Sequence, residues 1–306
     1  MNEFALIAAL KEVLAMPSAH VLAGIGDDAA VIRGGSGDLV WTIDAQVEGV
    51  HFRREWLSWA DVGFRSLMAA ASDLAAMGAE PVAALAALTV PPSVNRDMLL
   101  ALASGQREAA VRLGCPIAGG NIATGATFSV TTTVLGRTDR PLMRSGAKVG
   151  DLVQVAGRLG HAARGLSALE RGEPGHETFV DAWRRPEAQI AAGLRARTLA
   201  SAAIDVSDGL GQDVEHLARA SGVRVTLNEG QLLKWGPPGQ LHDALSLALG
   251  GGEDYALVVA APSPIGGFEI IGTVTDGEGV FVKCVDGREV PLAALARGYE
   301  HAVANR

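Results

Sequence analysis

The chain has 306 residues, of which 48% are hydrophobic and 20% are charged. This composition excludes an intrinsically disordered protein, and the length suggests about two domains. Lysine and arginine number 26 and aspartate and glutamate 34, which gives a net charge of −8. We do not expect a chain this acidic to bind nucleic acid or an anionic membrane surface, because both require a basic face.

Two cysteines, Cys115 and Cys284, are too few for a disulfide scaffold or a zinc site built from cysteines, and they suit a reducing compartment. The first residues, MNEFALIAALKEVL, lack the basic stretch and apolar core of a signal peptide. No apolar run reaches the ~18 residues that a membrane span needs. We therefore expect a cytoplasmic protein.

The first half of the chain interleaves predicted helices and strands. Apolar residues at helical spacing predict a helix over residues 3–16, and short apolar runs predict strands at 29–32 and 39–43 joined as a hairpin. Farther along, we expect helices at 59–77 and 94–113 and strands at 83–90, 116–118 and 127–135. Hairpin-like pairs among these elements favour an α+β fold over regular βαβ winding.

A polar, basic segment rich in glycine, residues 136–150, predicts a domain boundary. We place a mixed α/β amino-terminal domain at residues 1–137 and a carboxy-terminal α/β domain at 138–306. In the second domain we expect strands at 152–156, 202–206, 223–227 and 255–260 and helices at 161–171, 186–200 and 209–220.

Five short segments combine acidic residues with glycine or other small residues at predicted element ends. They are GDDAA (26–30), TID (42–44), SDLAAMG (72–78), DVSDG (205–209) and GGEDY (251–255). Each has an ordinary alternative: a turn, a solvated acid, an exposed helix acid, a helix N-cap and a plain loop, respectively. Adjacent carboxylates such as Asp27 and Asp28 repel each other unless a cation lies between them, which favours a metal site over a turn.

Asp73 is the most informative of these acids. It lies in the middle of a predicted helix, and the positions three and four residues away are Ala69, Ala70, Ala76 and Met77, so no local cation can pair with it. An unpaired carboxylate on such an apolar face costs free energy, and a metal ion removes this cost. Hard oxygen ligands of this kind suit Mg²⁺ bound to substrate phosphates.

Motifs for several other chemistries are missing. The sequence has no P-loop Gly-Lys-Ser/Thr and no Gly-x-Ser-x-Gly elbow, and its seven histidines lack zinc-site spacing. Positive charge for a phosphate must then come from Arg144 and Lys148 in the boundary segment, which are otherwise part of a solvated linker. His51 is a candidate substrate contact, although a lone histidine is more often structural.

Taken together and in this order, the segments resemble the thiamine-monophosphate kinase family, a relative of aminoimidazole ribonucleotide synthetase and selenophosphate synthetase. The resemblance extends from Phe4 to Tyr299. Its motifs are GIGDDAAV (24–31), TIDAQVEGVHF (42–52), SDLAAMGAEP (72–81), GGN (119–121), RSGAKVGD (144–151), DVSDGL (205–210) and GGEDY (251–255). GVHF and GGEDY separate this family from its relatives.

The resemblance implies an ATP-dependent kinase that converts thiamine monophosphate to thiamine diphosphate with several Mg²⁺ ions. It also implies a homodimer in which the amino-terminal sheets join into a shared barrel, with nucleotides near that interface. Because the acceptor phosphate is already ionised near neutral pH, direct in-line transfer of the γ-phosphoryl group needs no general base.

The resemblance also implies the roles of individual residues. The implied metal ligands are Asp28, Thr42, Asp44, Asp73, Asn121, Asp205 and Asp208. The implied nucleotide contacts are Gly120, Asn121, Arg144 and Ser207, and the implied substrate contacts are His51, Glu253 and Tyr299. The chain departs from the family at three positions: Asn121 replaces an aspartate found in many members, Ala70 a usual asparagine, and Ala296 a frequent aromatic residue.

Two alternatives stay open. One is another ATP-dependent synthetase of the superfamily. Selenophosphate synthetase needs a reactive cysteine or selenocysteine near the amino terminus, and this sequence has no cysteine before Cys115; a hydrogenase-maturation relative ends in cysteine, whereas this sequence ends Ala-Asn-Arg. The other is a non-catalytic nucleotide-binding regulatory protein, against which the intact set of acids argues.

Overall fold

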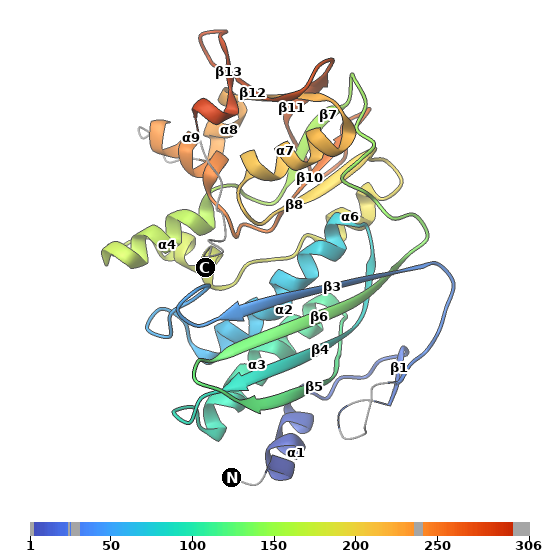
Figure 1. Cartoon of the computed structure of the whole chain (residues 1–306), viewed down its shortest axis with the longest axis vertical. Coiled ribbons are helices and arrows are strands. Elements are labelled where there is room, and N and C mark those ends of the chain that lie inside the picture. Colours follow the sequence, from blue (N-terminus) through green and yellow to red (C-terminus); the bar gives the residue numbers. More distant parts are fainter. Residues whose placement is uncertain (1–2, 24, 26–30, 236–240, 296–306) are drawn as a thin grey trace, which may run out of the picture. The chain divides into compact units, whose positions relative to one another are not determined.

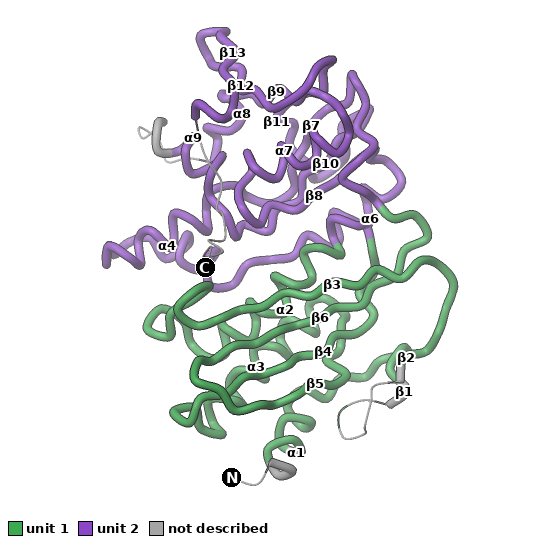
Figure 2. Tube along the Cα trace, viewed as in Figure 1, with its two compact units in different colours: residues 1–74, 79–141 green, residues 75–78, 142–306 purple. Residues whose placement is uncertain are grey.

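The computed structural model describes residues 3–23, 25, 31–235 and 241–295. The chain divides into two compact units, shown in green and purple in Figure 2: unit 1 comprises residues 1–74 and 79–141, and unit 2 residues 75–78 and 142–306. This division lies close to the boundary drawn from the sequence, but the assignment of residues 75–78 to unit 2 was not anticipated. It arises because Ala76 joins an apolar cluster of unit 2 and Gly193 packs against Ala75.

Unit 1 is built on a four-stranded sheet with helices α2 and α3 on one face (Figure 1). The order is β3-β6-β4-β5, and the pairs are antiparallel except for the parallel pair β4 and β5. The strands are β3 (Asp38–Val47), β4 (Glu80–Val90), β5 (Ile117–Thr124) and β6 (Ser129–Thr138). The helices are α1 (Glu3–Leu14), α2 (Trp59–Ala76) and α3 (Arg96–Leu113).

A small separate sheet in unit 1 corrects one prediction. Strands β1 (Val21–Ala23) and β2 (Val31–Ile32) pair with each other, whereas β3 pairs along its whole length with β6. The hairpin expected between residues 29–32 and 39–43 is therefore wrong. Gly37, directly before β3, has a φ of 89°, a turn conformation that glycine adopts readily, and β3 then enters a different sheet.

Helices α2 and α3 approach each other closely at Gly63 and Gly105. A Cβ atom at Gly63 would lie 1.9 Å from the carbonyl oxygen of Leu102, and one at Gly105 would lie 1.8 Å from that of Ala60. Only glycine permits this contact, which fixes α2 against α3. Because α2 carries Asp73, this packing also fixes the position of that carboxylate.

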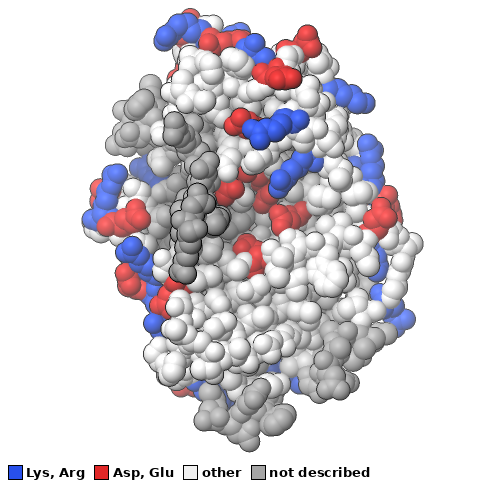
Figure 3. Space-filling model, viewed as in Figure 1, with Lys and Arg blue, Asp and Glu red and all other residues white. Residues whose placement is uncertain are grey.

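The alternation of side chains along β3 gives the sheet two different faces. Thr42 and Gln46 lie on the helix-covered face, where they contact α2. The opposite face presents Leu39, Trp41 and Ile43, which are 63%, 73% and 68% exposed. Figure 3, drawn from the same side as Figure 1, shows this part of unit 1 as a surface almost without charged side chains.

Unit 2 contains a seven-stranded sheet of order β13-β12-β9-β11-β7-β10-β8, in which only β9 and β12 are parallel neighbours. The strands are β7 (Leu152–Ala156), β8 (Ala202–Val206), β9 (Arg224–Asn228), β10 (Ala256–Ala261), β11 (Glu269–Thr275), β12 (Gly279–Lys283) and β13 (Glu289–Pro291). The helices are α4 (His161–Arg171), α5 (Glu177–Arg184), α6 (Ile190–Ala196), α7 (Leu210–Ser221), α8 (Glu229–Leu232) and α9 (Leu241–Gly250), with short 3₁₀ turns at Leu233–Trp235 and Leu292–Ala294.

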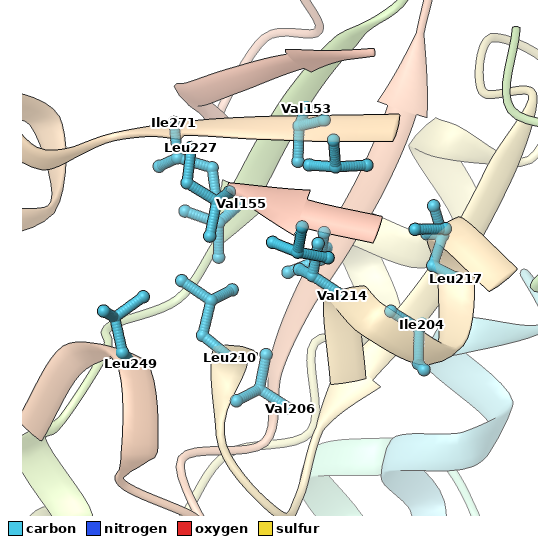
Figure 4. Packing of buried hydrophobic residues seen from close by; sticks show 14 of the residues in the cluster. Val153, Val155, Ile204, Val206, Leu210, Val214, Leu217, Leu227, Leu249 and Ile271 are labelled. Carbon is cyan, nitrogen blue, oxygen red and sulfur yellow. The ribbon is translucent and has the colours of Figure 1, made fainter. Parts of the chain in front are cut away.

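Apolar residues cover both faces of the central strands of unit 2. Every residue of β10 is buried, because alternate side chains enter two separate clusters. The larger cluster joins the sheet to α7 and α9, as Figure 4 shows for Val153, Ile204, Leu210 and Leu249. Burial on both faces explains why β10 reads as a continuous apolar run and not as an alternating strand.

The structure confirms a mixed α/β fold and most of the predicted helices and strands. The helix expected at 186–200 is limited to Ile190–Ala196, and α5, which spans only eight residues, was not predicted. In the described part of the chain, no helix is both long and apolar enough to span a membrane.

Candidate functional site

In unit 1, two predicted metal ligands are in direct contact. The hydroxyl of Thr42, on the helix-covered face of β3, donates a hydrogen bond to Oδ2 of Asp73 on α2. Ala69 and Ala70 beside Asp73 are buried, as the sequence predicts. No basic residue lies three or four positions from Asp73 on α2, as the sequence predicts, and the threonine hydroxyl from β3 is a partner that the sequence did not predict.

Asp44 extends this row of oxygen atoms along β3. It lies two residues after Thr42, on the same face, and its cross-strand neighbour in β6 is Thr132. Thr132 is fully buried, and its hydroxyl has no hydrogen-bond partner among the described residues. Carboxylate and hydroxyl oxygens are the ligands that Mg²⁺ prefers, and the unpartnered oxygen of Thr132 is one more such atom on this face, so the residue types fit the predicted ion.

The remaining predicted residues of unit 1 lie elsewhere. His51 follows β3, and its Nδ1 accepts a hydrogen bond from the backbone N–H of Val47 at 3.1 Å. Gly120 and Asn121 are on the edge strand β5 and are exposed. Asn121 is paired with Ala87 on the exposed face of the sheet, whereas Thr42 and Asp73 meet on the opposite face. Asp28, Tyr299 and Ala296 lie outside the described residues.

In unit 2, the DVSDG and GGEDY segments lie side by side at the adjoining ends of β8 and β10. The backbone N–H of Tyr255 donates to the carbonyl of Val206 at 2.9 Å, and that of Glu253 donates to the carbonyl of Ser207 at 2.8 Å. A Cβ atom at Gly252 would lie 2.6 Å from the Ser207 carbonyl oxygen, which explains the glycine. A predicted nucleotide contact, Ser207, thus adjoins a predicted substrate contact, Glu253.

A carboxylate that sequence reasoning missed holds the DVSDG turn. Asp213, in the first turn of α7, is 3% exposed, and its Oδ2 accepts hydrogen bonds from the backbone N–H groups of Ser207 (3.1 Å), Asp208 (3.2 Å) and Gly209 (3.2 Å). Burial, followed by the charges of Asp205 and Asp208, raises the pKa of Asp213 to about 7. An acid in the first turn of the predicted helix was the available signal.

Asp254 holds a second element of the site. Its two carboxyl oxygens accept the backbone N–H groups of Gly160 at 2.5 Å and Ala162 at 2.9 Å, so the side chain caps the amino terminus of α4. Burial raises the pKa of Asp254 to about 7. The residues on either side, Glu253 and Tyr255, have φ values of 67° and 49°, a region that residues other than glycine rarely adopt. Such strain is typical of functional segments.

The side chain of Glu253 is also anchored. The indole N–H of Trp183, on α5, donates to Oε2 of Glu253 at 2.8 Å. Trp183 was missed because its helix was not predicted. Arg144 is exposed at the start of unit 2, and its carbonyl accepts a hydrogen bond from the Ser221 hydroxyl at 3.1 Å.

The ligand set of a metal ion is not assembled in the described residues. Within ranges 3–23, 25, 31–235 and 241–295, no three His, Cys, Asp or Glu side chains form a group that could hold an ion. The predicted ligands Asp205 and Asp208 belong to unit 2, and Thr42, Asp44 and Asp73 belong to unit 1. The assignment of these residues to Mg²⁺ therefore stays a prediction.

Asp254 and its neighbour His161 predict opposite dependences of stability on pH. Burial raises the pKa of Asp254 from 3.8 to about 7, so stability is lost as the pH rises across this range. Burial, with help from Arg158 and Arg164, lowers the pKa of His161 from 6.5 to about 4, so stability is lost as the pH falls. Asp254→Asn removes the contribution that falls with pH and keeps that of His161. The free energy of unfolding of this variant is therefore expected to rise more steeply with pH than that of the wild type.

Urea unfolding midpoints between about pH 4.5 and 6.5 check this expectation. Asp97→Asn serves as the control, because the Asp97 side chain is 90% exposed and pairs only at the surface. Parallel pH profiles for the wild type and the Asp254→Asn variant would contradict the assigned titration.

Comparison with known proteins shows what this chain is similar to in sequence and in fold. The family described as AIR synthase related protein, N-terminal domain, matches residues 26–138. The thiamine-monophosphate kinase of Mycobacterium tuberculosis is 36% identical over 308 aligned positions, covering 94% of this chain and 89% of that protein. A solved structure of thiamine-monophosphate kinase from Stenotrophomonas maltophilia K279a matches with a TM-score of 0.81 and 32% identity over 94% of this chain and 98% of that one. Another, described as AaThiL complexed with AMPPCP and TMP, matches with a TM-score of 0.76 and 32% identity over 94% of each chain.

Proposed function

Because the chain belongs to the thiamine-monophosphate kinase family, we propose that it catalyses the ATP-dependent phosphorylation of thiamine monophosphate to thiamine diphosphate. The observation that carries the proposal is the adjacency, in unit 2, of the DVSDG and GGEDY segments. Phosphoryl transfer requires the donor and acceptor to be held next to each other, and these segments supply a nucleotide contact at Ser207 and an acceptor contact at Glu253. The relative described with AMPPCP and TMP supports the same pair of ligands.

The proposed mechanism is direct in-line transfer that depends on positioning. Bound Mg²⁺ would neutralise charge on the phosphates, and the proposed ligands are Asp28, Thr42, Asp44, Asp73, Asn121, Asp205 and Asp208. Gly120, Asn121, Arg144 and Ser207 bind the nucleotide, and His51, Glu253 and Tyr299 bind the acceptor. Because the acceptor phosphate is already ionised, no side chain has to remove a proton from it. The residues of the chain act by binding the nucleotide and the acceptor and by orienting their phosphates.

An ATP-dependent assay with three candidate acceptors tests the function. Thiamine monophosphate, free thiamine and aminoimidazole precursors are compared, and products are identified by mass. We expect thiamine diphosphate to form in step with ATP consumption. Turnover of an aminoimidazole precursor alone would favour the synthetase alternative, and binding of ATP·Mg by calorimetry without any product would favour the regulatory alternative.

We also place the enzyme in the cytoplasm. Cys115 and Cys284 are both free thiols, and burial raises the pKa of Cys115 to about 12, which keeps it protonated and unreactive. Free thiols persist in reducing compartments, where ATP and thiamine monophosphate would also be available.

A homodimer formed through the exposed sheet of unit 1 completes the proposal. Leu39, Trp41 and Ile43 of β3 and Leu85 of β4 are exposed on the face that lacks helices. Contiguous apolar side chains on a sheet face with little charge mark an interaction surface, and a second copy of the same sheet is a matching partner (Figure 3). In this proposal, residues 1–137 bind ATP and Mg²⁺ and form a barrel across the dimer.

Ile43→Glu is expected to convert the dimer to a monomer, because the interface would have to bury an unpaired carboxylate. Size-exclusion chromatography with light scattering measures the change in mass. Val285→Glu is the matched control, since Val285 is 75% exposed in unit 2 and its replacement is expected to leave the dimer intact. A dimeric Ile43→Glu variant would rule out this face as the interface.

A further inference from the structure

Glu253 is held at an unusual backbone conformation. Its φ of 67° is in the left-handed region, and Tyr255, two residues later, has a φ of 49°. The N–H groups of both residues are bonded to the DVSDG segment, so the backbone cannot relax without losing these bonds. The chain therefore holds the backbone of Glu253 in a strained conformation, which is typical of residues with a functional role.

Contacts with helices α4 and α5 hold Glu253 and its neighbour Asp254 in place. Asp254 caps the amino terminus of α4 through the N–H groups of Gly160 and Ala162. Helix α4 touches α5 at Gly165, where a Cβ atom would lie 2.0 Å from the carbonyl oxygen of Phe179. One turn farther along α5, Trp183 returns to Glu253 through its indole N–H. Both ends of the Glu253–Asp254 pair are thus tied to the same helical hairpin.

Trp183 is suited to this task by its burial. It is the largest fully buried side chain of the structure's described residues, at 1% exposed, and a buried indole requires an acceptor for its N–H group. A hydrogen bond to a charged acceptor is stronger than one between neutral groups and fixes direction. The indole therefore restricts the rotamers of the Glu253 carboxylate.

We propose that Trp183 is a positioning residue that aims the Glu253 carboxylate at the phosphoryl acceptor and thereby sets the affinity for it. The inference rests on the proposed function, since it assigns the acceptor to Glu253. Trp183 acts through Glu253 and does not itself touch the acceptor.

Trp183→Phe tests the inference because it removes the N–H group and keeps an aromatic ring. We expect the KM for thiamine monophosphate to rise about tenfold, with little change in kcat and in the KM for ATP. Trp235→Phe, the same change at a partly buried tryptophan of unit 2 packed against the large apolar cluster, is the control and is expected to match the wild type.

Two further measurements separate positioning from a general loss of packing. In a double-mutant cycle, Trp183→Phe is expected to have no additional effect on the KM in the Glu253→Ala background, which has no acceptor for the indole N–H group, whereas a packing defect would add to it. In ¹⁵N-labelled protein, the indole N–H resonance that Trp183→Phe deletes is expected to shift in Glu253→Gln and on addition of thiamine monophosphate.

The wild-type protein keeps the two proposals distinguishable. If it does not phosphorylate thiamine monophosphate, the proposed function is refuted, and this inference with it. If it does so and Trp183→Phe leaves the KM unchanged, or the two substitutions are additive, the inference alone is refuted.

Discussion

Replacing Asp73 by asparagine is expected to lower kcat for the phosphorylation of thiamine monophosphate by about a thousandfold or more. Asparagine keeps the size of the side chain and can still accept the hydrogen bond from Thr42, but it removes the negative charge on the oxygen that would bind the ion. A metal ion that neutralises phosphate charge stabilises the transition state by several kcal/mol, and this stabilisation is reduced when the ion loses a charged ligand. A loss of about 4 kcal/mol corresponds to a thousandfold lower rate.

Steady-state kinetics at several Mg²⁺ concentrations measure the effect, and calorimetry of ATP·Mg binding reports on the ion independently of turnover. Asp97→Asn makes the same chemical change in the same unit at an exposed position and is expected to retain wild-type rates. A Mg²⁺ dependence and a kcat close to those of the wild type in Asp73→Asn would remove Asp73 from the set of ligands.

The position of Asp73 was predictable because helical periodicity alone places it on an apolar face. Its partner was not, since Thr42 lies 31 residues earlier and reaches Asp73 only after β3 pairs with β6. The period-two alternation along β3 indicates that Thr42 and Asp44 share a face, but not that α2 covers that face. The acids could therefore be identified one by one, whereas their grouping depended on the tertiary fold.

The errors have the same physical origin. The false hairpin between residues 29–32 and 39–43 came from local glycine signals, and the distant strand β6 overrode them. Helix α5 spans only eight residues, so its apolar residues Phe179, Val180 and Trp183 cover too few turns to establish a helical period. Asp213 lies in an ordinary position for a helix-capping acid, and only its three bonds to the preceding turn distinguish it. Local sequence patterns do not reveal residues whose role is a contact with another segment of the chain.

Asp213 leads to the second large expected effect. A single oxygen, Oδ2, accepts the N–H groups of Ser207, Asp208 and Gly209, so Asp213→Ala leaves three backbone donors without their acceptor. Each unsatisfied buried donor costs about 1–3 kcal/mol unless the turn moves to reach water. We expect the turn to move, which displaces Ser207 and Asp208 and lowers kcat/KM by about a hundredfold or more.

Asp213→Asn separates geometry from charge. Asparagine retains one carbonyl oxygen, which can accept all three N–H groups from the position of Oδ2, but it has no negative charge. If the role of Asp213 is to shape the turn, Asp213→Asn keeps most of the activity while Asp213→Ala loses it. If the carboxylate contributes its charge to a bound ion, both variants lose activity to a similar extent.

Hydrogen exchange at the three amides provides the structural readout. In the wild type and in Asp213→Asn, the amides of Ser207, Asp208 and Gly209 are expected to be protected, and in Asp213→Ala they are expected to exchange rapidly while the strands of the sheet stay protected. Full protection of these amides in Asp213→Ala would show that the turn is held by other contacts. Because Glu253 donates its N–H to the carbonyl of Ser207, a mobile turn should also expose the amide of Glu253, which would couple the proposed nucleotide contact at Ser207 to the proposed acceptor contact at Glu253.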